Sequence, residues 1–574
     1  MKRYGRKIVV LLLVLLLALA AWVWWQRPRR VEMAGYVPAG ALIYLECNDL
    51  PSLVEALSTT EAWRTAAGPA GLDADLGRVG WWARVAAWTG FGSAEQVALA
   101  RAQVAVAVLG VQTAADEGAL KLKPQYAVVI ETHTGAARVQ TVVETRVGAF
   151  ARNAYGTPRV ERKDEDGAGY TIWHAPDGKR QIVAAQMGSV IIVGPEESAV
   201  RACLEVRRGV RPGLAGNAGL AEMRARVAAD SALAFGYVAP EGLGQLLRVG
   251  ATVYAAPLVL GDPRLAGAVN SLLPVLAGQI SNGLGWSARL DNGAIADLYH
   301  LTLKNNLAAR LQDALATAPN MPDALAAFVP SDAYSLSQYN YRAPAAAWEG
   351  FQRGLAGQVD AVSALLLTRL LPLAFQPYGI TEPSAFLATL GPVTATARLN
   401  DAEGGTVIIA KVNDETALRA LVPQLLGGAP GPSEQVSGAD IFTDGTPDGR
   451  AAAFTGGYLL LGPAERVRRC LEARKQGATL AQSPAWRRAA DTVTPTPQAV
   501  SYTDDQAAAR AFLTFVATRN ATGKAQPVAL SQALARLPYA VSETRLTNDA
   551  LEKQTRSAFG LIGTLAAQFR TEKL

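Results

Sequence analysis

The chain carries one stretch twice, and this duplication constrains its fold more than any other feature does. The first copy, SVIIVGPEESAVRACLEVR, spans residues 189–207, and the second copy, YLLLGPAERVRRCLEAR, spans residues 458–474. The two Gly-Pro pairs begin at Gly194 and Gly462, which lie 268 positions apart (462 − 194). The simplest explanation is a duplication of about half the chain.

The repeated stretch predicts a buried strand that leads into an amphipathic helix. Each aliphatic run ends at a breaker, as buried strands do, and Pro195 and Pro463 suit the first helical position, which needs no N–H. Spacing of i, i+3 and i+4 places Cys203 and Cys470 on the apolar faces of their helices. We therefore expect both cysteines to be buried between helix and sheet. Each helix should also carry an i,i+4 ion pair on its outer face: Arg201–Glu205 and Arg468–Glu472.

Turn motifs elsewhere in the chain recur in the same order around the two copies. Each half opens with a Val-Pro segment, continues through a Gly-containing hairpin turn and closes with a second hairpin. The matching segments are Val37–Gly40 with Val329–Asp332, Asp177-Gly178 with Asp448-Gly449, and Arg289–Gly293 with Arg545–Asp549. Strands joined by tight turns, with helices between them, predict an α+β fold.

The predicted architecture is an N-terminal transmembrane helix followed by two duplicated domains of mainly antiparallel sheet with packed helices. We assign residues 1–30 to a membrane anchor, 31–304 to the first repeat, 305–328 to a linker and 329–574 to the second repeat. Within the first repeat, Val104–Leu109 and Tyr126–Thr132 are predicted strands, and Arg159–Gly169 is a polar stretch without a predicted strand. A strongly apolar helical region is expected over Glu241–Gln279, with breaks at its prolines.

The N-terminus has the pattern of a membrane anchor. Residues 8–25 form an unbroken apolar run of 18 residues that ends in tryptophans, with basic residues on both sides. This length is about the minimum for a membrane-spanning helix. The alternative is a cleaved signal peptide with Ala18-Leu19-Ala20 as its cleavage site. The anchor predicts a single-pass inner-membrane protein with residues 31–574 in the periplasm or outside the cell.

The distribution of charge gives no support to one large class of partners. The net charge is +6, from 55 Lys and Arg against 49 Asp and Glu, but residues 1–30 hold seven basic and no acidic residues. The remainder is therefore nearly neutral, with 48 basic and 49 acidic residues (55 − 7 against 49). A neutral body gives no support to nucleic-acid binding.

The sequence contains no established catalytic, metal or cofactor motif. Three cysteines make no disulfide framework. His174 beside Asp177 is a weak acid–base candidate, Asp164–Asp166 is a weak calcium candidate, and Gly213–Gly219 resembles a phosphate loop only superficially because it follows a predicted helix. We therefore predict no catalytic, cofactor-binding or metal-binding residues, no cofactor and no enzymatic activity.

One stretch has some functional interest. Val249–Leu276 is apolar over most of its surface, which is typical of a helix pair buried against a sheet. The alternatives are the wall of an apolar ligand pocket or a membrane-facing surface. A lipid-like ligand near this stretch is therefore the second function hypothesis.

The opening strand of each repeat carries a resemblance. Val37-Pro38-Ala39-Gly40, with its weaker counterpart Val329-Pro330-Ser331-Asp332, resembles the Val-Pro-Ala-Asp-like start of tandem domains in bacterial envelope proteins of unknown function. Gly40 departs from the acidic position of that pattern. The resemblance implies a membrane-anchored, non-catalytic binding or scaffold protein with a protein partner in the cell envelope, and no catalytic residues. An uncharacterised hydrolase is the remaining alternative.

Overall fold

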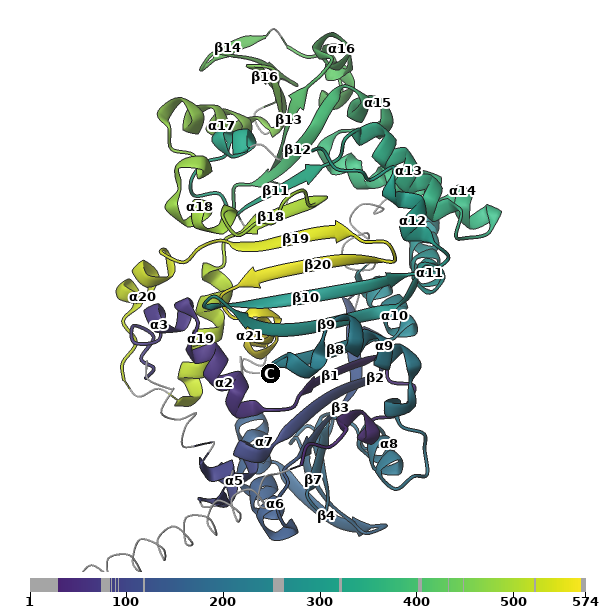
Figure 1. The fold of residues 1–574 in the computed structure, drawn as a ribbon, viewed down its shortest axis with the longest axis vertical. Coiled ribbons are helices and arrows are strands. Elements are labelled where there is room, and N and C mark those ends of the chain that lie inside the picture. The colour runs from purple at the N-terminus through teal and green to yellow at the C-terminus, as the bar shows by residue number, and fades with distance from the viewer. Residues whose placement is uncertain are drawn as a thin grey trace, which may run out of the picture. The chain divides into compact units, whose positions relative to one another are not determined.

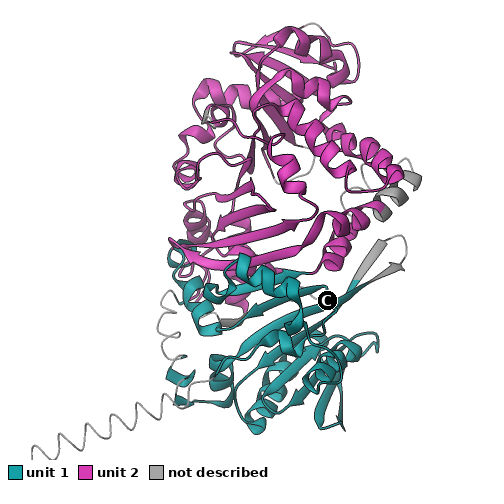
Figure 2. Ribbon diagram, turned by 45° about the vertical axis from the view of Figure 1, so that its right-hand side comes forward, with its two compact units in different colours: residues 1–64, 73–238, 569–574 teal, residues 65–72, 239–568 magenta. Residues whose placement is uncertain are grey.

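A computed structural model describes most of the chain, and Figure 1 shows its helices and strands. The described residues are 29–73, 83, 85–87, 89–90, 92–116, 119–250, 263–319, 323–400, 405–431, 433–446, 449–520 and 523–568. The chain divides into two compact units, which Figure 2 colours separately. Unit 1 comprises residues 1–64, 73–238 and 569–574, and unit 2 comprises residues 65–72 and 239–568.

Unit 1 alternates short helices with strands that are joined by tight turns. Its strands are β1 (Ile43–Cys47), β2 (Gln103–Asp116), β3 (Ala119–Glu131), β4 (Arg159–Glu165), β5 (Ala168–His174), β6 (Gln181–Met187), β7 (Val190–Gly194) and β8 (Ala234–Val238). Its helices are η1 (Met33–Tyr36), α2 (Leu50–Ser58), α5 (Ala94–Arg101), α6 (Ala136–Val142), η2 (Val143–Val147), α7 (Gly148–Tyr155), α8 (Glu197–Arg207), η3 (Leu214–Gly216), α9 (Ala218–Arg226) and η4 (Ala229–Ser231). Helix α3 (Glu61–Ala66) belongs partly to each unit.

Unit 2 is larger and begins with a pair of helices. Its strands are β9 (Ser281–Asp291), β10 (Ala294–Leu303), β11 (Ser335–Asn340), β12 (Leu390–Arg398), β13 (Thr406–Val412), β14 (Glu434–Val436), β15 (Ala439–Thr443), β16 (Arg450–Thr455), β17 (Tyr458–Pro463), β18 (Ala499–Thr503), β19 (Ala540–Leu546) and β20 (Ala550–Ser557). Its helices are α10 (Pro240–Gly250), α11 (Pro263–Ile280), α12 (Leu307–Gln312), η7 (Asp323–Phe328), α13 (Pro344–Ala356), α14 (Ala361–Leu370), η8 (Leu371–Tyr378), α15 (Pro383–Ala388), α16 (Glu415–Leu426), α17 (Ala464–Gln476), η9 (Leu480–Gln482), α18 (Pro484–Ala490), α19 (Gln506–Asn520), α20 (Pro527–Leu534) and α21 (Gly560–Gln568).

The two units repeat one order of strand pairing. In unit 1 the order is β8-β1-β2-β3-β7-β6-β5-β4. In unit 2 the order β18-β11-β12-β13-β17-β16-β15-β14 follows the same path. Isolated bridges also correspond, Pro38 with Gly213 and Pro330 with Thr479. The matching sequence landmarks therefore lie at matching places in two sets of strands.

The pairing of β10 with β20 corrects the predicted fold class. The strands form a single antiparallel sheet of 20 strands, not the separate sheets of two duplicated domains that we expected after a transmembrane helix. The hairpin β9–β10, predicted to close the first repeat, lies in unit 2 and pairs with the hairpin β19–β20. The compact units thus divide between β8 and α10, whereas the repeat ranges 31–304 and 329–574 stay a prediction.

Helices cover both faces of the sheet in each unit. In unit 1, Trp173 and Ile191 pack with Val139 of α6. Helix α8 packs on β3, β6 and β7, on the opposite face because neighbouring strand residues alternate. In unit 2, Ile408 and Ile409 of β13 enter different hydrophobic cores. The sheet is therefore the middle layer of each unit.

The repeated stretch forms the strand and helix that the sequence predicts. Strand β7 leads into α8, and β17 leads into α17. Gly194 and Gly462 allow close approach of the next strand, because a Cβ there would lie 2.7 Å from the Tyr126 carbonyl oxygen and 2.8 Å from that of Thr406. The predicted helix starts were wrong: Pro195 precedes the N-cap of α8, and Pro463 is itself the N-cap of α17.

The polar stretch 159–169 contains a strand that the sequence did not predict. Strand β4 pairs with β5 on one side only among the described residues. Its side chains are mostly exposed and charged, with Arg159, Glu161 and Arg162 in its first half. Charged side chains on an edge strand hinder pairing with other chains. This composition hides the strand from a search for apolar alternation.

The structure contradicts the predicted membrane anchor. No helix in the described part of the chain is both long and apolar enough to cross a membrane. This finding opposes the predicted transmembrane helix and signal anchor, the membrane as a partner and the single-pass inner-membrane location. Residues 8–25 and the alternative cleavage site at Ala18-Leu19-Ala20 lie outside the described residues.

The burial of both repeated cysteines is confirmed. Cys203 and Cys470 are each 0% exposed, and burial raises the pKa of each thiol to about 12. A thiol with a raised pKa is a poor nucleophile and metal ligand. These cysteines therefore pack the helix against the sheet.

We predict that Cys203 and Cys470 react with a thiol reagent only after the protein unfolds. Cys470→Asp should lower the free energy of unfolding by about 4 kcal/mol, because it buries an unpaired charge. Cys470→Ala should lower it by about 1 kcal/mol, since little volume is lost. Urea titration measures both effects, and labelling of either thiol in the native protein within seconds would contradict the prediction.

Candidate functional site

His174 and Asp177, the acid–base candidates, do not form a pair. His174 Nε2 lies 3.3 Å from Glu161 Oε2, and Asp177 Oδ2 lies 3.6 Å from Arg180 Nε. Asp177 also accepts a hydrogen bond from the Lys179 N–H across the turn between β5 and β6. Both side chains therefore make surface contacts within the strands and turns of β4, β5 and β6.

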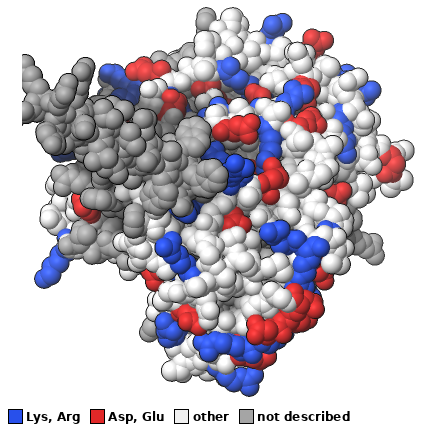
Figure 3. Space-filling model, turned by 60° about the horizontal axis from the view of Figure 1, so that its bottom comes forward, with Lys and Arg blue, Asp and Glu red and all other residues white. Residues whose placement is uncertain are grey.

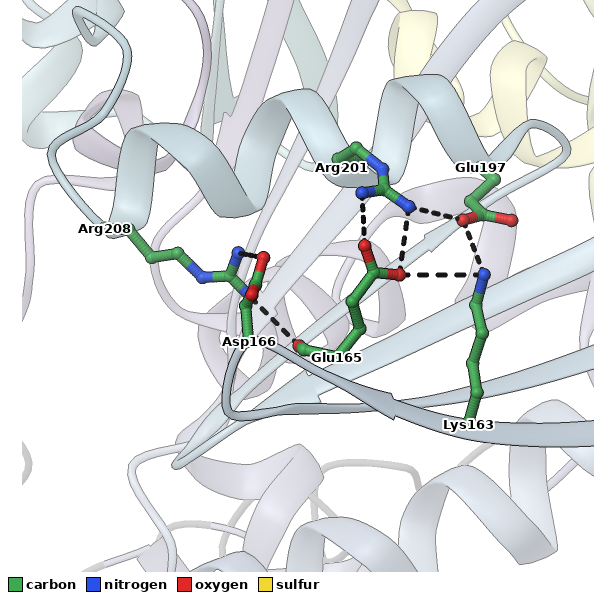
Figure 4. Close-up of polar contacts among 6 residues, drawn as sticks. All are labelled: Lys163, Glu165, Asp166, Glu197, Arg201 and Arg208. Carbon is green, nitrogen blue, oxygen red and sulfur yellow. Dashed lines mark hydrogen bonds and ion pairs between the residues drawn. The ribbon is translucent and has the colours of Figure 1, made fainter.

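Within the calcium candidate Asp164–Asp166, Glu165 and Asp166 form ion pairs with α8 and its C-cap instead (Figure 4). Arg201 donates to both oxygens of Glu165 at 2.5 and 3.0 Å, and Arg208 donates to Asp166 at 3.1 Å. The hydrogen bond from Arg201 lowers the pKa of the Glu165 carboxyl. Among the described residues, no group of three or more His, Cys, Asp or Glu could hold a metal ion. These carboxylates connect the β4–β5 hairpin to the helix.

The predicted i,i+4 pairs along the repeated helices do not form. Arg201 pairs with the hairpin and with Glu197, four residues before it, while Glu205 pairs with Arg211 at 2.9 Å. In unit 2, Arg468 lies 3.1 Å from Glu434 of β14. Arg201 and Arg468 occupy matching positions before the two cysteines. Each unit therefore connects its helix to its edge hairpin through an arginine at the equivalent position.

The glycine-rich segment Gly213–Gly219 is a connection between helices. It contains η3 and the first residues of α9. The Asn217 side chain accepts a hydrogen bond from the Leu220 N–H and caps α9. The glycines therefore belong to a connection that leads into α9, and this connection gives the segment its resemblance to a phosphate loop.

A buried carboxylate organises the polar interior of unit 1. Glu46 of β1 is 5% exposed, and burial raises the pKa of its carboxyl. It accepts hydrogen bonds from the Tyr44 hydroxyl at 2.7 Å and from the Arg224 guanidinium at 2.9 Å. Arg224 also lies 2.8 Å from Glu32, just before η1. The group therefore connects β1, α9 and the first described segment of the chain.

Gln103 extends this polar interior to the chain before η1. Its side-chain amide accepts from the Val31 N–H at 2.8 Å and donates to the Val31 carbonyl at 3.0 Å. It also donates to Asn48 and contacts His133 Nε2 at 2.9 Å. Burial lowers the pKa of His133. These groups bond to one another and to the Val31 backbone.

Strand pairing creates a histidine–carboxylate contact that the sequence did not predict. His300 of β10 lies opposite Glu552 of β20, and His300 Nδ1 is 2.9 Å from Glu552 Oε1. A carboxylate that orients an imidazole is one part of many catalytic sites. His300 is only 3% exposed, however, and its buried Nε2 has no hydrogen-bond partner among the described residues. No nearby sequence signal connects two residues so far apart.

The buried carboxylate of Asp297 and the partly exposed carboxylate of Asp505 hold the turn between β20 and α21. Asp505 accepts from the Ala558 N–H at 2.6 Å, and Asp297 accepts from the Leu561 N–H and the Trp286 indole, each at 2.9 Å. Burial raises the pKa of Asp297 to about 6 and that of Asp505 to about 7. Both carboxyls consequently titrate near neutral pH.

A groove between α10 and α11 is a candidate ligand site in the described part of unit 2. It encloses about 300 Å³, which is at the lower end of small-molecule pockets. The lining residues come from α10, from the end of α11 and from the segment after β10: Pro240, Glu241, Gly244, Gln245, Arg248, Pro274, Gly278 and Lys304. All of them belong to unit 2.

Helix geometry brings the polar lining residues together. Glu241, Gln245 and Arg248 follow i, i+4, i+7 spacing and share one face of α10. Gly244 lies on the same face and permits close contact with α11, since a Cβ there would lie 3.3 Å from the Pro274 carbonyl oxygen. The two helices thus approach closely at one point and present charged side chains beside it.

Lys304 lies on the side of the groove away from α10, and the space beside Gly278 of α11 is open. The Lys304 ammonium donates to the Gly278 carbonyl at 2.8 Å, and cations near a helix C-terminus are favourable. A Cβ added to Gly278 would meet no atom within 4 Å. The groove therefore contains both signs of charge and has room beside α11.

The predicted apolar region Val249–Leu276 lies beside this groove. Leu272 and Leu276 are buried in a core with Leu307 and Leu355, which agrees with a helix packed inside the protein. Residues 251–262 lie outside the described part of the chain. An apolar ligand at this region stays a prediction.

Charged side chains of both signs are mixed on the surface shown in Figure 3. Lys and Arg side chains lie next to Asp and Glu side chains across this face, without separation into one basic and one acidic area. Mixed charge agrees with the nearly neutral composition of residues 31–574. The absence of a nucleic-acid partner stays a prediction.

Comparisons with known proteins do not identify a relative. No family model matches the chain, and searches of curated proteins and solved structures found no significant match. The resemblance to bacterial envelope proteins therefore stays a prediction. The groove has to be interpreted from its own chemistry.

We predict that Arg224→Met destabilises unit 1 by about 3 kcal/mol, because the Glu46 carboxylate remains buried without its cation. The double variant Glu46→Gln with Arg224→Met should recover part of this loss. Urea titration of both variants measures the difference. Equal stability of Arg224→Met and the native protein would contradict the role of this pair.

We also predict that the β20–α21 turn becomes less stable as the pH rises from 5 to 8. The pKa values of Asp297 and Asp505 are raised in the folded protein, so the folded state binds more protons than the unfolded state between pH 4 and 7, and stability falls as those protons leave. The opening constant should rise by up to about tenfold per pH unit for each carboxyl.

Hydrogen exchange at the 558–561 amides, corrected for intrinsic rates, measures this change. Asp505→Asn keeps an oxygen that accepts from the Ala558 N–H and removes the charge, so its pH dependence should be weaker. The same pH dependence in this variant and in the native protein would show that Asp505 is not responsible.

Proposed function

We propose that the protein is a non-catalytic binding protein whose ligand site is the groove between α10 and α11. The single observation that supports this proposal is a cavity of about 300 Å³ lined by Glu241, Gln245, Arg248 and Lys304. A concave volume lined by a few charged and polar side chains is typical of a ligand site.

Other polar clusters among the described residues are closed by protein donors and line no comparable volume. Glu46, Glu165 and Asp297 each accept hydrogen bonds from protein donors. The His300 imidazole is buried beneath the surface, where a substrate does not reach its Nε2 atom. Catalysis needs an acid, base or nucleophile beside a bound substrate. Glu241 is the one carboxylate among the described residues that line the groove.

The experiment that tests this function blocks the groove without disturbing the fold. Gly278→Leu places a side chain into open space, and leucine in a helix is favoured over glycine by up to about 1 kcal/mol. Gly250→Leu is a matched control, because Gly250 ends α10, also has nothing within 4 Å of its Cβ and does not line the groove.

We predict that ligands from a panel of amino acids, short peptides, dicarboxylates, nucleosides and fatty acids raise the thermal midpoint of the native protein and of Gly250→Leu, but not of Gly278→Leu. A ligand at 100 times its Kd stabilises by about 2.7 kcal/mol. A ligand that stabilises all three proteins equally would place the site elsewhere. Turnover of any panel compound by the purified protein would contradict a non-catalytic function.

A further inference from the structure

We infer that α21 is a detachable helix, which docks on the sheet of unit 2 in acid and leaves it as Asp297 and Asp505 ionise. Opening is then not confined to the turn between β20 and α21 but moves the whole helix as one unit. This inference goes beyond the proposed function and does not depend on it, because no residue of α21 lines the groove.

Helix α21 buries little of its own side-chain surface. Its buried residues are two glycines, Gly560 and Gly563, and Leu565 is 37% exposed. The main apolar anchor is Phe559, just before the helix, whose ring centroid lies 4.4 Å from that of Phe512 on α19. A segment with few buried apolar contacts opens at a low free-energy cost. The polar contacts at the start of α21 therefore decide whether it stays docked.

Two carboxylates from different elements bind backbone N–H groups at this start. Asp297 of β10 accepts from the Leu561 N–H at 2.9 Å, and Asp505, directly before α19, accepts from the Ala558 N–H at 2.6 Å. The other oxygen of Asp297 accepts from the Trp286 indole of β9 at 2.9 Å. The contacts that connect α21 to the sheet thus meet at Asp297.

Gly560 lets the helix approach the sheet closely. Its φ is +64°, and a Cβ there would lie 2.5 Å from Ile295 Cγ2 and 2.9 Å from Asp297 Oδ2. Ile295 is 0% exposed and Asp297 is 1% exposed, and α21 packs on β9, β10, β20 and α19. The docked helix therefore keeps water away from the Asp297 carboxyl, and its release exposes this carboxyl together with apolar surface around Ile295.

Few other charges face these carboxylates. Helix α21 has no ionisable side chain between Gly560 and Gln568, and the face of β9 that carries Trp286 has none either. Four titratable or charged groups come from β10, β20, the segment before α19 and α19: Tyr299, Lys553, Asp504 and Arg510. Burial, and then Asp297, raise the pKa of Tyr299, which stays neutral. Lys553 is exposed, and Arg510 donates to Ser531.

The direction of the change follows from where protons bind more tightly. Burial raises the pKa of Asp297 to about 6, whereas the same carboxyl has an ordinary pKa of about 4 once the helix has left. The docked state gains stability from this proton below about pH 4 and loses it as the pH rises to about 6. Desolvation raises the pKa of Asp505 to about 7, which extends the loss to about pH 7.

The test is hydrogen exchange of the full chain between about pH 4.5 and about pH 7, corrected for intrinsic rates. We expect the opening constant of the amides at 563–568 to rise at least about tenfold over this range, in step with that of the Leu561 amide. The double variant Asp297→Asn with Asp505→Asn should lose most of this rise. Asp313→Asn is the matched control, because Asp313 is an exposed carboxylate at the end of α12, and it should keep the rise.

Gly560→Ala provides a released reference, because its Cβ has no room beside Ile295 in the docked state. Its amides at 563–568 should exchange rapidly at every pH, while its thermal midpoint verifies that the rest of the chain folds. A rise confined to residues 558–561 of the native protein would overturn release of the whole helix. Exchange at 563–568 that does not change with pH would overturn the inference without any variant. An undiminished rise in the double variant would show that other groups are responsible.

Discussion

The antiparallel pairing of β10 with β20 is the contact on which the arrangement of unit 2 depends. It aligns Ile295 with Ser557 at one end and Thr302 with Ala550 at the other, and Leu298 with Gln554 is one of its two central pairs. The duplication relates residues 256 apart in this part of the chain, as in Arg289 and Arg545 (545 − 289), so Leu298 and Gln554 are equivalent positions that pair with each other. The two closing hairpins therefore cover one another's edges, which removes two open edges that could pair with other chains.

Local patterns predicted the elements whose causes are local. The apolar face around Cys203 and Cys470 follows from helical spacing, and both residues are buried as that spacing requires. Long-range pairing was not predictable in the same way. The contact between His300 and Glu552 exists because two strands align in one register, and neither residue has a neighbour in the sequence that indicates it. The strand β4 was missed for another reason, since its charged residues carry no apolar alternation.

The ion pairs of α8 combine a local helix contact with contacts to the neighbouring hairpin. An Arg placed four residues before a Glu is the weaker order on a helix. Arg201 instead pairs with Glu197, four residues before it, and with two carboxylate oxygens of Glu165 on the neighbouring hairpin. Arg468 likewise forms an ion pair with Glu434 of β14. A bidentate contact is stronger and better oriented than a single i,i+4 contact. The same arginine therefore connects helix and edge hairpin in both units, although the acidic partners do not occupy the same hairpin position.

The groove illustrates why the sequence could indicate a helix pair but not a site. Nothing in the sequence distinguishes Gly244 from Gly278. A Cβ added to Gly244 would lie 3.3 Å from the Pro274 carbonyl oxygen, whereas a Cβ added to Gly278 would point into open space. The first glycine brings the helices together, and the second leaves the volume that a ligand could fill. Lys304 joins them from the far side of a hairpin. Only the folded arrangement distinguishes a glycine that packs against a helix from a glycine that leaves a cavity. Because Gly278 leaves open space across from α10, the polar face of α10 becomes a candidate binding surface.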